Sequence, residues 1–237
     1  MGEGAGTAAE SLSITMRQPP ATPRGARTRA ALVTAARTVF ERDGYLDAKL
    51  ADITKEARCA TGSFYTYFTN KEEVFAAVLE EAQQEMMHPG TDRVSDSDDP
   101  YAVLEASNRA YLQAYQRNAK LMGLLEEVAH LDVQFRAFRA RRADAFVRRN
   151  AQGIADLQQR GLADQDLDPI FVSWALSGMV SRAAYSVLVL GESHNLGGEP
   201  PDVETLTTSL TRLWSNALRL PGSNTSPRPD ESMLVPR

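Results

Sequence analysis

The sequence predicts an all-α protein of 237 residues, with a small N-terminal helical domain followed by a larger helical domain. Apolar residues recur at i, i+3, i+4 and i+7 spacing along most of the chain, and no segment alternates as a strand does. A stretch with Pro, Gly, Ser and Asp, residues 88–100, interrupts this pattern once. The hydrophobic content of 43% is sufficient for a packed core.

Four helices are expected before the break. The first has an apolar face formed by Ala31, Leu32, Ala35, Ala36, Val39 and Phe40. Gly44 is positioned to end this helix as a C-cap. Short helices over 50–58 and 60–67 follow, and a fourth begins at Asn70, which forms a capping pair with Glu73.

Five further helices are expected after the break, over 101–118, 121–130, 132–160, 169–190 and 203–220. Gly161 supplies a left-handed cap with Leu162 as its apolar contact. Asp168 is a good N-cap and Pro169 a good first residue for the helix over 169–190. That helix is apolar nearly all round, which predicts burial on all sides.

These features predict the domain boundaries. Residues 1–23, rich in Gly, Ala, Ser, Thr and Pro, are expected to form a disordered arm, and residues 221–237 a disordered tail. The three-helix N-terminal domain takes residues 24–70 and the larger domain residues 71–220. The terminal Leu-Val-Pro-Arg resembles the remnant of an engineered protease site, so no function is inferred from it.

Charge is unevenly distributed along the chain. From Arg17 to Lys71 there are ten Lys or Arg against five Asp or Glu, whereas the rest of the chain from Glu72 has a local charge of −8. A basic N-terminal part on an acidic body is expected when only one end contacts phosphates. Chance clustering is the alternative on charge alone.

Several classes of function are not supported by the sequence. Cys59 is the single cysteine, and no metal-spaced His/Cys cluster, cofactor motif, paired carboxylates or nucleophile–base constellation is present, so no enzyme, metal or cofactor is predicted. No apolar run reaches the length of about 20 residues that a membrane span needs. No apolar signal-peptide core begins the chain, and the expected location is cytoplasmic.

The stretch from Ala57 to Glu73 is the most informative part of the sequence. A DNA-recognition helix brings short polar residues at its N-terminal end to base edges, which suits Thr61 and Ser63, while Gly62 allows close approach. Tyr65 and Tyr67 can direct phenol groups at phosphates, and Lys71 can do so near a helix N-terminus. On spacing alone, either tyrosine could be core instead and Lys71 a solvated lysine. Phe64 and Phe68, four apart, are expected in the core.

On these residues, positions 25–80 resemble the N-terminal domain of TetR-family transcriptional regulators. The matching elements are Ala35-Ala36, Phe40, Gly44-Tyr45, Asp52-Ile53, Ala57, Gly62-Ser63-Phe64-Tyr65, Tyr67-Phe68 and Asn70-Lys71-Glu72. Three positions depart from the pattern, since the family usually has Gly at Arg58, often a Ser-like cap at Ala60 and often Thr at Lys49.

The resemblance implies a homodimer in which the helices 169–190 and 203–219 pair with their counterparts as a four-helix bundle. It implies double-stranded DNA as a partner, with two recognition helices in successive major grooves of a palindromic operator, about 34–36 Å apart. The DNA-binding residues would be Lys49, Thr61, Gly62, Ser63, Tyr65, Thr66, Tyr67 and Lys71.

The larger domain of such proteins binds ligands and mediates dimerisation. A small, largely apolar effector would favour the released conformation. Candidate lining residues are Asn108, Tyr111, Tyr115, Phe135, Phe138, Arg142, Trp174 and Met179. For the polar members, a helix–helix hydrogen bond or salt bridge is the alternative interpretation. The run of arginines over 139–149 favours a solvated, ion-paired face over a site for a phosphate-bearing ligand such as an acyl-CoA.

The function predicted on these grounds is that of a homodimeric transcriptional repressor, released from its operator by the effector. A TetR-like activator or a ligand-independent regulator is the alternative, and an all-α enzyme is a distant third.

Overall fold

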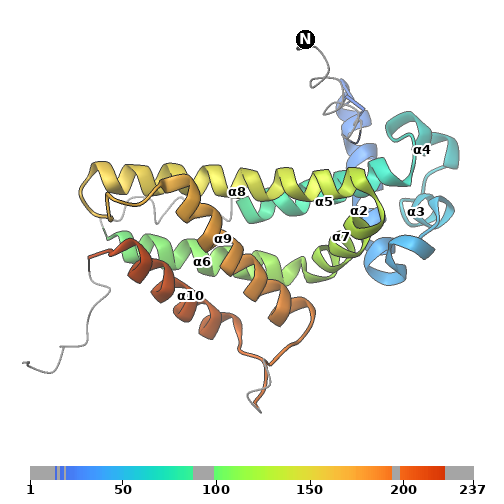
Figure 1. Cartoon of the computed structure of the whole chain (residues 1–237). Helices are drawn as coiled ribbons and strands as arrows, with labels where there is room; N and C mark the ends of the chain where they lie inside the picture. The colour runs from blue at the N-terminus through green and yellow to red at the C-terminus, as the bar shows by residue number, and fades with distance from the viewer. Residues whose placement is uncertain (1–13, 15–16, 19, 88–98, 194–197, 222–237) are drawn as a thin grey trace, which may run out of the picture. The chain divides into compact units, whose positions relative to one another are not determined.

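The computed structural model describes residues 14, 17–18, 20–87, 99–193 and 198–221, and within these residues the chain is helical without strands (Figure 1). The all-α prediction is therefore confirmed. Most of the predicted arm and nearly all of the tail, the interruption over 88–98 and the terminal Leu-Val-Pro-Arg lie outside the described residues.

The helices of the N-terminal part fall close to their predicted positions. They are α2 (Pro23–Asp47), α3 (Leu50–Glu56), α4 (Thr61–Tyr67) and α5 (Lys71–Met87). Gly44, with φ 79° and ψ 170°, breaks the helical path inside α2, as its predicted role requires, and helical residues continue for a further three positions. Asn70 Oδ1 accepts the N–H of Glu73 at 2.8 Å, so the predicted capping pair forms.

The remaining helices are α6 (Pro100–Arg117), α7 (Ala119–Leu131), α8 (Val133–Gln159), α9 (Pro169–Ala184) and α10 (Val203–Leu218). Two predicted caps are present: Asp168 accepts the N–H of Phe171 at 2.7 Å, and Gly161 lies at φ 69°. The predicted single helix over 169–190 is instead α9 followed by a π-helical turn, Tyr185–Val189.

The chain divides into two compact units, which are described separately. The first comprises residues 1–88, 114–146 and 188–191, and the second residues 89–113, 147–187 and 192–237. Each unit is made of three separate segments of the chain, so this division does not test the domain boundaries predicted at 24–70 and 71–220. Those boundaries remain a prediction.

The core of the first unit is formed by α2 packed on α3, α5 and α7. Phe40, Tyr45, Phe75 and Phe135 form a cluster in which neighbouring ring centres lie 4.8–5.9 Å apart. Such offset and edge contacts stabilise a core beyond the area they bury. The cluster anchors the end of α2, and therefore the place where the short helices begin.

The second unit contains the packed pair α9 and α10. Its helices are joined by buried or half-buried polar contacts, among them Asn108 to Thr211 at 3.0 Å and Asn150 to Ser177 at 3.0 Å. The prediction that α9 is buried on all sides is wrong for the single chain. Phe171 and Trp174 are 63% and 62% exposed, and Ile170 and, on α10, Leu213 are also exposed.

Candidate nucleic-acid interface

The short helix α4 has one face packed in the core and one face exposed to solvent, which we call the bare face and which carries Thr61, Gly62, Tyr65 and Thr66. Phe64 and Phe68 are fully buried, with ring centres 5.6 Å apart, as predicted from their spacing. Thr61, Tyr65 and Thr66 are exposed on the opposite side, and Ser63 and Tyr67 are half-buried. A Cβ built on Gly62 would meet nothing within 4 Å, so the glycine leaves this surface open.

The turn before α4 takes a conformation that ordinarily favours glycine. Arg58 has φ 52°. Its N–H donates to the carbonyl oxygen of Lys55 at 3.1 Å, and the N–H of Cys59 donates to the carbonyl oxygen of Thr54 at 3.0 Å. This pair of bonds is a Schellman motif, in which the left-handed position is usually Gly. The departure noticed in the sequence is therefore a site of backbone strain within a regular helix-ending turn.

The N-terminal ends of α3 and α4 lack side-chain caps. Lys49 and Ala60 occupy the two N-cap positions, and neither forms a side-chain capping hydrogen bond. Lys49 is exposed. The N–H groups that open both helices therefore donate to no cap side chain, although those of Asp52 and Ser63 donate to the carbonyl oxygens of Lys49 and Ala60 at 3.0 and 2.8 Å. A phosphate oxygen is a suitable acceptor for the remaining groups.

Lys71 is tied to the end of α2. Its ammonium donates to the carbonyl oxygens of Tyr45, Leu46 and Ala48 at 2.8, 3.1 and 3.2 Å. The same ammonium lies 4.7 Å from the centre of the Tyr45 ring, whose hydroxyl donates to Glu72 at 3.1 Å. Burial beside Glu72 raises the pKa of the Tyr45 phenol well above its usual range, so Tyr45 stays protonated as a donor.

Sequence reasoning missed Arg17. Its guanidinium donates to the carbonyl oxygens of Tyr65 and Thr66 at 2.7 and 3.2 Å, and its backbone N–H donates to Glu73. A single basic residue in a stretch without periodicity gives no signal for such a contact, because the partners lie 48 or more positions further along the chain.

The predicted ligand-lining residues fall on both units. Tyr115, Phe135, Phe138 and Arg142 belong to the first, and Asn108, Tyr111, Trp174 and Met179 to the second. Phe135 is fully buried in the aromatic cluster, whereas Trp174 is largely exposed. Asn108 is buried and donates to Thr211, which fits the alternative interpretation of a helix–helix hydrogen bond.

A cavity of about 170 Å³ in the first unit includes two of these residues. Phe138 and Arg142 line it together with Ile14, Ala76 and other side chains. The Arg142 guanidinium contacts the sulfur atoms of Met122 and Met86 at 3.2 and 3.6 Å. Nearby on α8, Arg139 pairs with Glu126, as an ion-paired face would.

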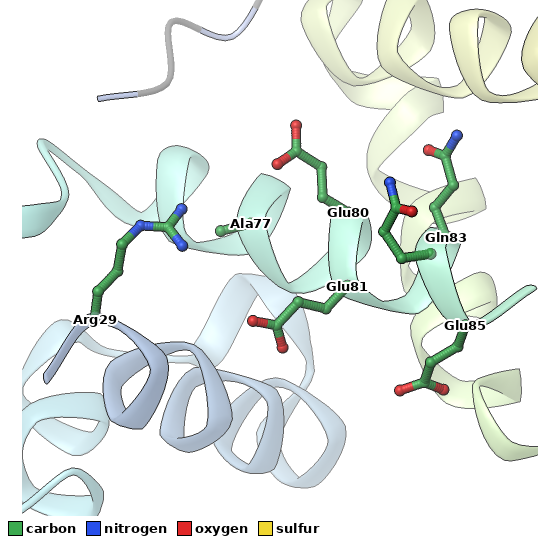
Figure 2. Close-up of a pocket in the computed structure, with 7 residues that line it drawn as sticks. Arg29, Ala77, Glu80, Glu81, Gln83 and Glu85 are labelled. Carbon is green, nitrogen blue, oxygen red and sulfur yellow. The ribbon is translucent and has the colours of Figure 1, made fainter. Parts of the chain in front are cut away.

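A second feature of the first unit is an open groove of about 700 Å³ along α5. Figure 2 shows Arg29 reaching from α2 towards α5, from which Glu80, Glu81 and Glu85 project. Burial raises the pKa of the Glu80 carboxyl, and Arg29 and Arg141 partly oppose that effect. The pKa of Glu81 is raised for the same reason.

Two further findings concern absences among the described residues. No group of three or more His, Cys, Asp or Glu in the part of the chain that the structure covers could hold a metal ion. Within that same part, every helix is too short or too polar to cross a membrane.

Comparison with known proteins gives the same interpretation of the N-terminal part. Residues 32–78 match the model of the bacterial regulatory proteins, tetR family. Over 56 residues, 24% of this chain, the sequence is 39% identical to YdgC of Bacillus subtilis (strain 168), an uncharacterised HTH-type transcriptional regulator. The aligned stretch spans 29% of that relative.

Solved structures share the fold over most of the chain. A Mesorhizobium loti MAFF303099 protein described as a TetR-family transcriptional regulator has a TM-score of 0.68 at 20% identity, covering 82% of this chain and 98% of that one. The transcriptional regulator FadR from Bacillus subtilis, in complex with stearoyl-CoA, has a TM-score of 0.66 at 16% identity, covering 80% and 98%. The N-terminal part therefore matches the DNA-binding domain of the tetR family, and the described chain has a TetR-like fold.

Proposed function

We propose that this protein is a homodimeric repressor that binds a palindromic operator and is released from it by a small, largely apolar ligand. The observation that carries the proposal is the division of α4 into a face anchored by Phe64 and Phe68 and an exposed face that presents Thr61, Tyr65 and Thr66 beside Gly62. A recognition helix needs both, because it must be held rigidly and must approach base edges closely.

In this proposal the DNA-binding residues of α4 and of the helix ends beside it divide by role. Thr61 and Ser63 meet base edges, with Gly62 permitting close approach. Lys49, Tyr65, Thr66, Tyr67 and Lys71 contact the phosphate backbone. Base contacts give sequence preference, whereas phosphate contacts give affinity that falls with salt.

The exposed apolar residues of the second unit support a dimer. Ile170, Phe171 and Trp174 on α9 and Leu213 on α10 are each more than half exposed, and the rings of Phe171 and Trp174 lie 5.8 Å apart. Exposed apolar side chains on two helices that pack together are typical of an interaction site. A second copy of α9 and α10 would cover it symmetrically and present two copies of α4 to the two halves of a palindrome.

The effector in this proposal binds in the first unit, beside Phe138 and Arg142. The cavity beside Phe138 and Arg142, at about 170 Å³, is smaller than the several hundred Å³ typical of ligand sites, so binding would have to enlarge it. FadR from Bacillus subtilis holds stearoyl-CoA on a similar fold, which makes a long-chain acyl-CoA one compound to test. A ligand releases the protein from DNA when the enlarged state that it prefers has the lower affinity for the operator.

A band-shift assay with the DNA upstream of the protein's own gene tests the proposal. We expect binding that weakens with salt and that depends on both halves of a palindrome. Binding to all duplexes alike, or none to this DNA, would contradict the operator role. Adding stearoyl-CoA and shorter acyl-CoAs to the complex then tests release.

The alternative functions give different results in the same experiment. A ligand-independent regulator would bind the palindrome and stay bound with every compound. An activator would bind it and raise transcription from the adjacent promoter in a reconstituted assay, whereas the proposed repressor would lower it.

A further inference from the structure

We propose that Arg17 is a positioning residue for DNA binding: it caps the C-terminal end of α4 and fixes the direction of the recognition helix without contacting DNA itself. The inference rests on the DNA-binding role proposed above. It concerns a residue before the first described helix, where the sequence predicts only a disordered arm.

The recognition helix needs support from outside itself. It has seven residues, fewer than a helix needs to be stable alone in water. Ala60 gives no side-chain cap at its N-terminus. Phe64 and Phe68 hold one face in the core, but two anchors along one line leave the helix able to rotate about that line.

Arg17 supplies a contact at the other end of the helix. The last carbonyl groups of a helix have no partner within it. The Arg17 guanidinium donates to those of Tyr65 and Thr66, at 2.7 and 3.2 Å. A positive charge at the C-terminal end of a helix also interacts favourably with the helix dipole.

The backbone of Arg17 is held in turn by the next helix. Its N–H donates to Glu73, whose carboxylate also accepts the N–H and hydroxyl of Thr69 at 2.6 and 2.8 Å. Glu73 is only 1% exposed and belongs to the capping pair that opens α5. Arg17 therefore joins the end of α4 to the start of α5 through two different groups.

A second residue of the same segment is packed as well. Ile14 lines the small cavity with Ala76 of α5 and Phe138 of α8. Ile14 and Arg17, the two described residues of this stretch with such neighbours, both lie against α5, Ile14 beside Ala76 and Arg17 through Glu73. Arg17 binds the backbone carbonyl groups of Tyr65 and Thr66, and the side chains of these same two residues are exposed. The position of Arg17 is therefore linked to the surface that faces DNA.

The test compares Arg17→Ala, Arg17→Lys and Lys49→Ala in the full chain. The probes are a duplex that the wild-type protein selects from a random-sequence pool and a scrambled duplex of the same composition. Affinity for each is measured over a series of salt concentrations, and thermal melting monitors folding. Lys49→Ala serves as the reference for loss of a proposed phosphate contact.

For Arg17→Ala we expect about tenfold weaker binding to the selected duplex, from two lost charge-assisted hydrogen bonds, with little change on the scrambled one. The slope of log K against log salt stays unchanged. Arg17→Lys recovers most of the discrimination, because its ammonium can still donate to the carbonyl groups. Lys49→Ala weakens both duplexes and reduces the slope by about 0.9.

Two results would overturn the inference. In one, Arg17→Ala binds the selected duplex as the wild type does. In the other, it weakens both duplexes equally and reduces the salt slope, which would make Arg17 a phosphate contact. If the wild-type protein selects no duplex at all, the proposed function itself is wrong, and this outcome is distinct from either result for Arg17.

Discussion

The ammonium of Lys71 lies 4.7 Å from the centre of the Tyr45 ring and donates a 2.8 Å hydrogen bond to the carbonyl oxygen of the same residue. Lys71 opens α5, and Tyr45 lies just after the break at Gly44, in the last residues of α2. A lysine at the tip of one helix therefore caps the end of another, which fixes the loop from which α3 begins.

Replacing Lys71 tests both this cap and the proposed phosphate contact. Lys71→Met keeps the aliphatic stem but removes three hydrogen bonds to carbonyl groups and the contact with the ring. We expect a loss of about 1–3 kcal/mol in the free energy of unfolding, measured by urea titration. Lys55→Met, at an exposed lysine of α3, is the control and should change the free energy of unfolding little.

The same variant separates the two roles on DNA. If Lys71 also contacts a phosphate, Lys71→Met reduces the salt slope of binding by about 0.9. An unchanged slope with weakened binding would remove Lys71 from the phosphate contacts and leave it as a cap alone.

Arg58→Gly should stabilise the N-terminal domain. A non-glycine residue at φ 52° carries strain that glycine does not, although glycine also gains entropy in the unfolded chain. The expected net gain is about 0.5–1 kcal/mol in the free energy of unfolding. Ala57→Gly, one residue earlier at φ −71°, is the matched control and should lower the free energy of unfolding. If both changes destabilise, Arg58 is not strained in solution.

Gly62→Ala should change stability and DNA binding in opposite directions. The added methyl group meets nothing within 4 Å and removes a glycine from a helix, so the domain should gain about 0.5 kcal/mol. Because the methyl group projects from the bare face, operator binding should weaken at the same time. A Gly62→Ala protein that is more stable and binds as tightly would show that this face is not in close contact with DNA.

Trp174→Glu should dissociate the proposed dimer. The tryptophan is 62% exposed in the single chain and is a natural anchor for a partner, so its loss should cost about 2–4 kcal/mol per copy. Light scattering after size exclusion should then give the mass of a monomer. Leu131→Glu, at a leucine 74% exposed in the first unit, is the control and should leave the dimer intact.

Glu80→Gln should stabilise the protein at neutral pH but not in acid. Glu80 is exposed at the residue level, but partial desolvation of its carboxyl in the groove along α5 raises its pKa despite Arg29 and Arg141, so its ionised form is slightly disfavoured in the folded state. The penalty is fully present above the folded pKa and vanishes below the unfolded value of about 4.3. Urea midpoints across this range should converge as the pH falls.

Glu127→Gln is the control for this change of charge. Glu127 is exposed on α7, and its replacement removes the same charge from a solvated position. If the two variants show the same pH dependence, the effect at Glu80 reflects net charge and not the local desolvation of its carboxyl in the groove.

The sequence by itself determined the helices and several of their caps. The capping pair at Asn70 and Glu73, the N-cap at Asp168 and the left-handed turn at Gly161 were all predictable, because each depends on residues within a few positions of one another. The buried face of α4 followed from the four-residue spacing of Phe64 and Phe68 for the same reason.

Only the tertiary structure decided which distant groups meet. Lys71 finds its carbonyl partners 23–26 positions away and Arg17 its partners 48 or more away, and neither distance is encoded in a local period. The sequence also marked α9 as apolar without revealing which residues the single chain leaves exposed. That outcome depends on which neighbouring helices cover each face, and so on the packing of the whole unit.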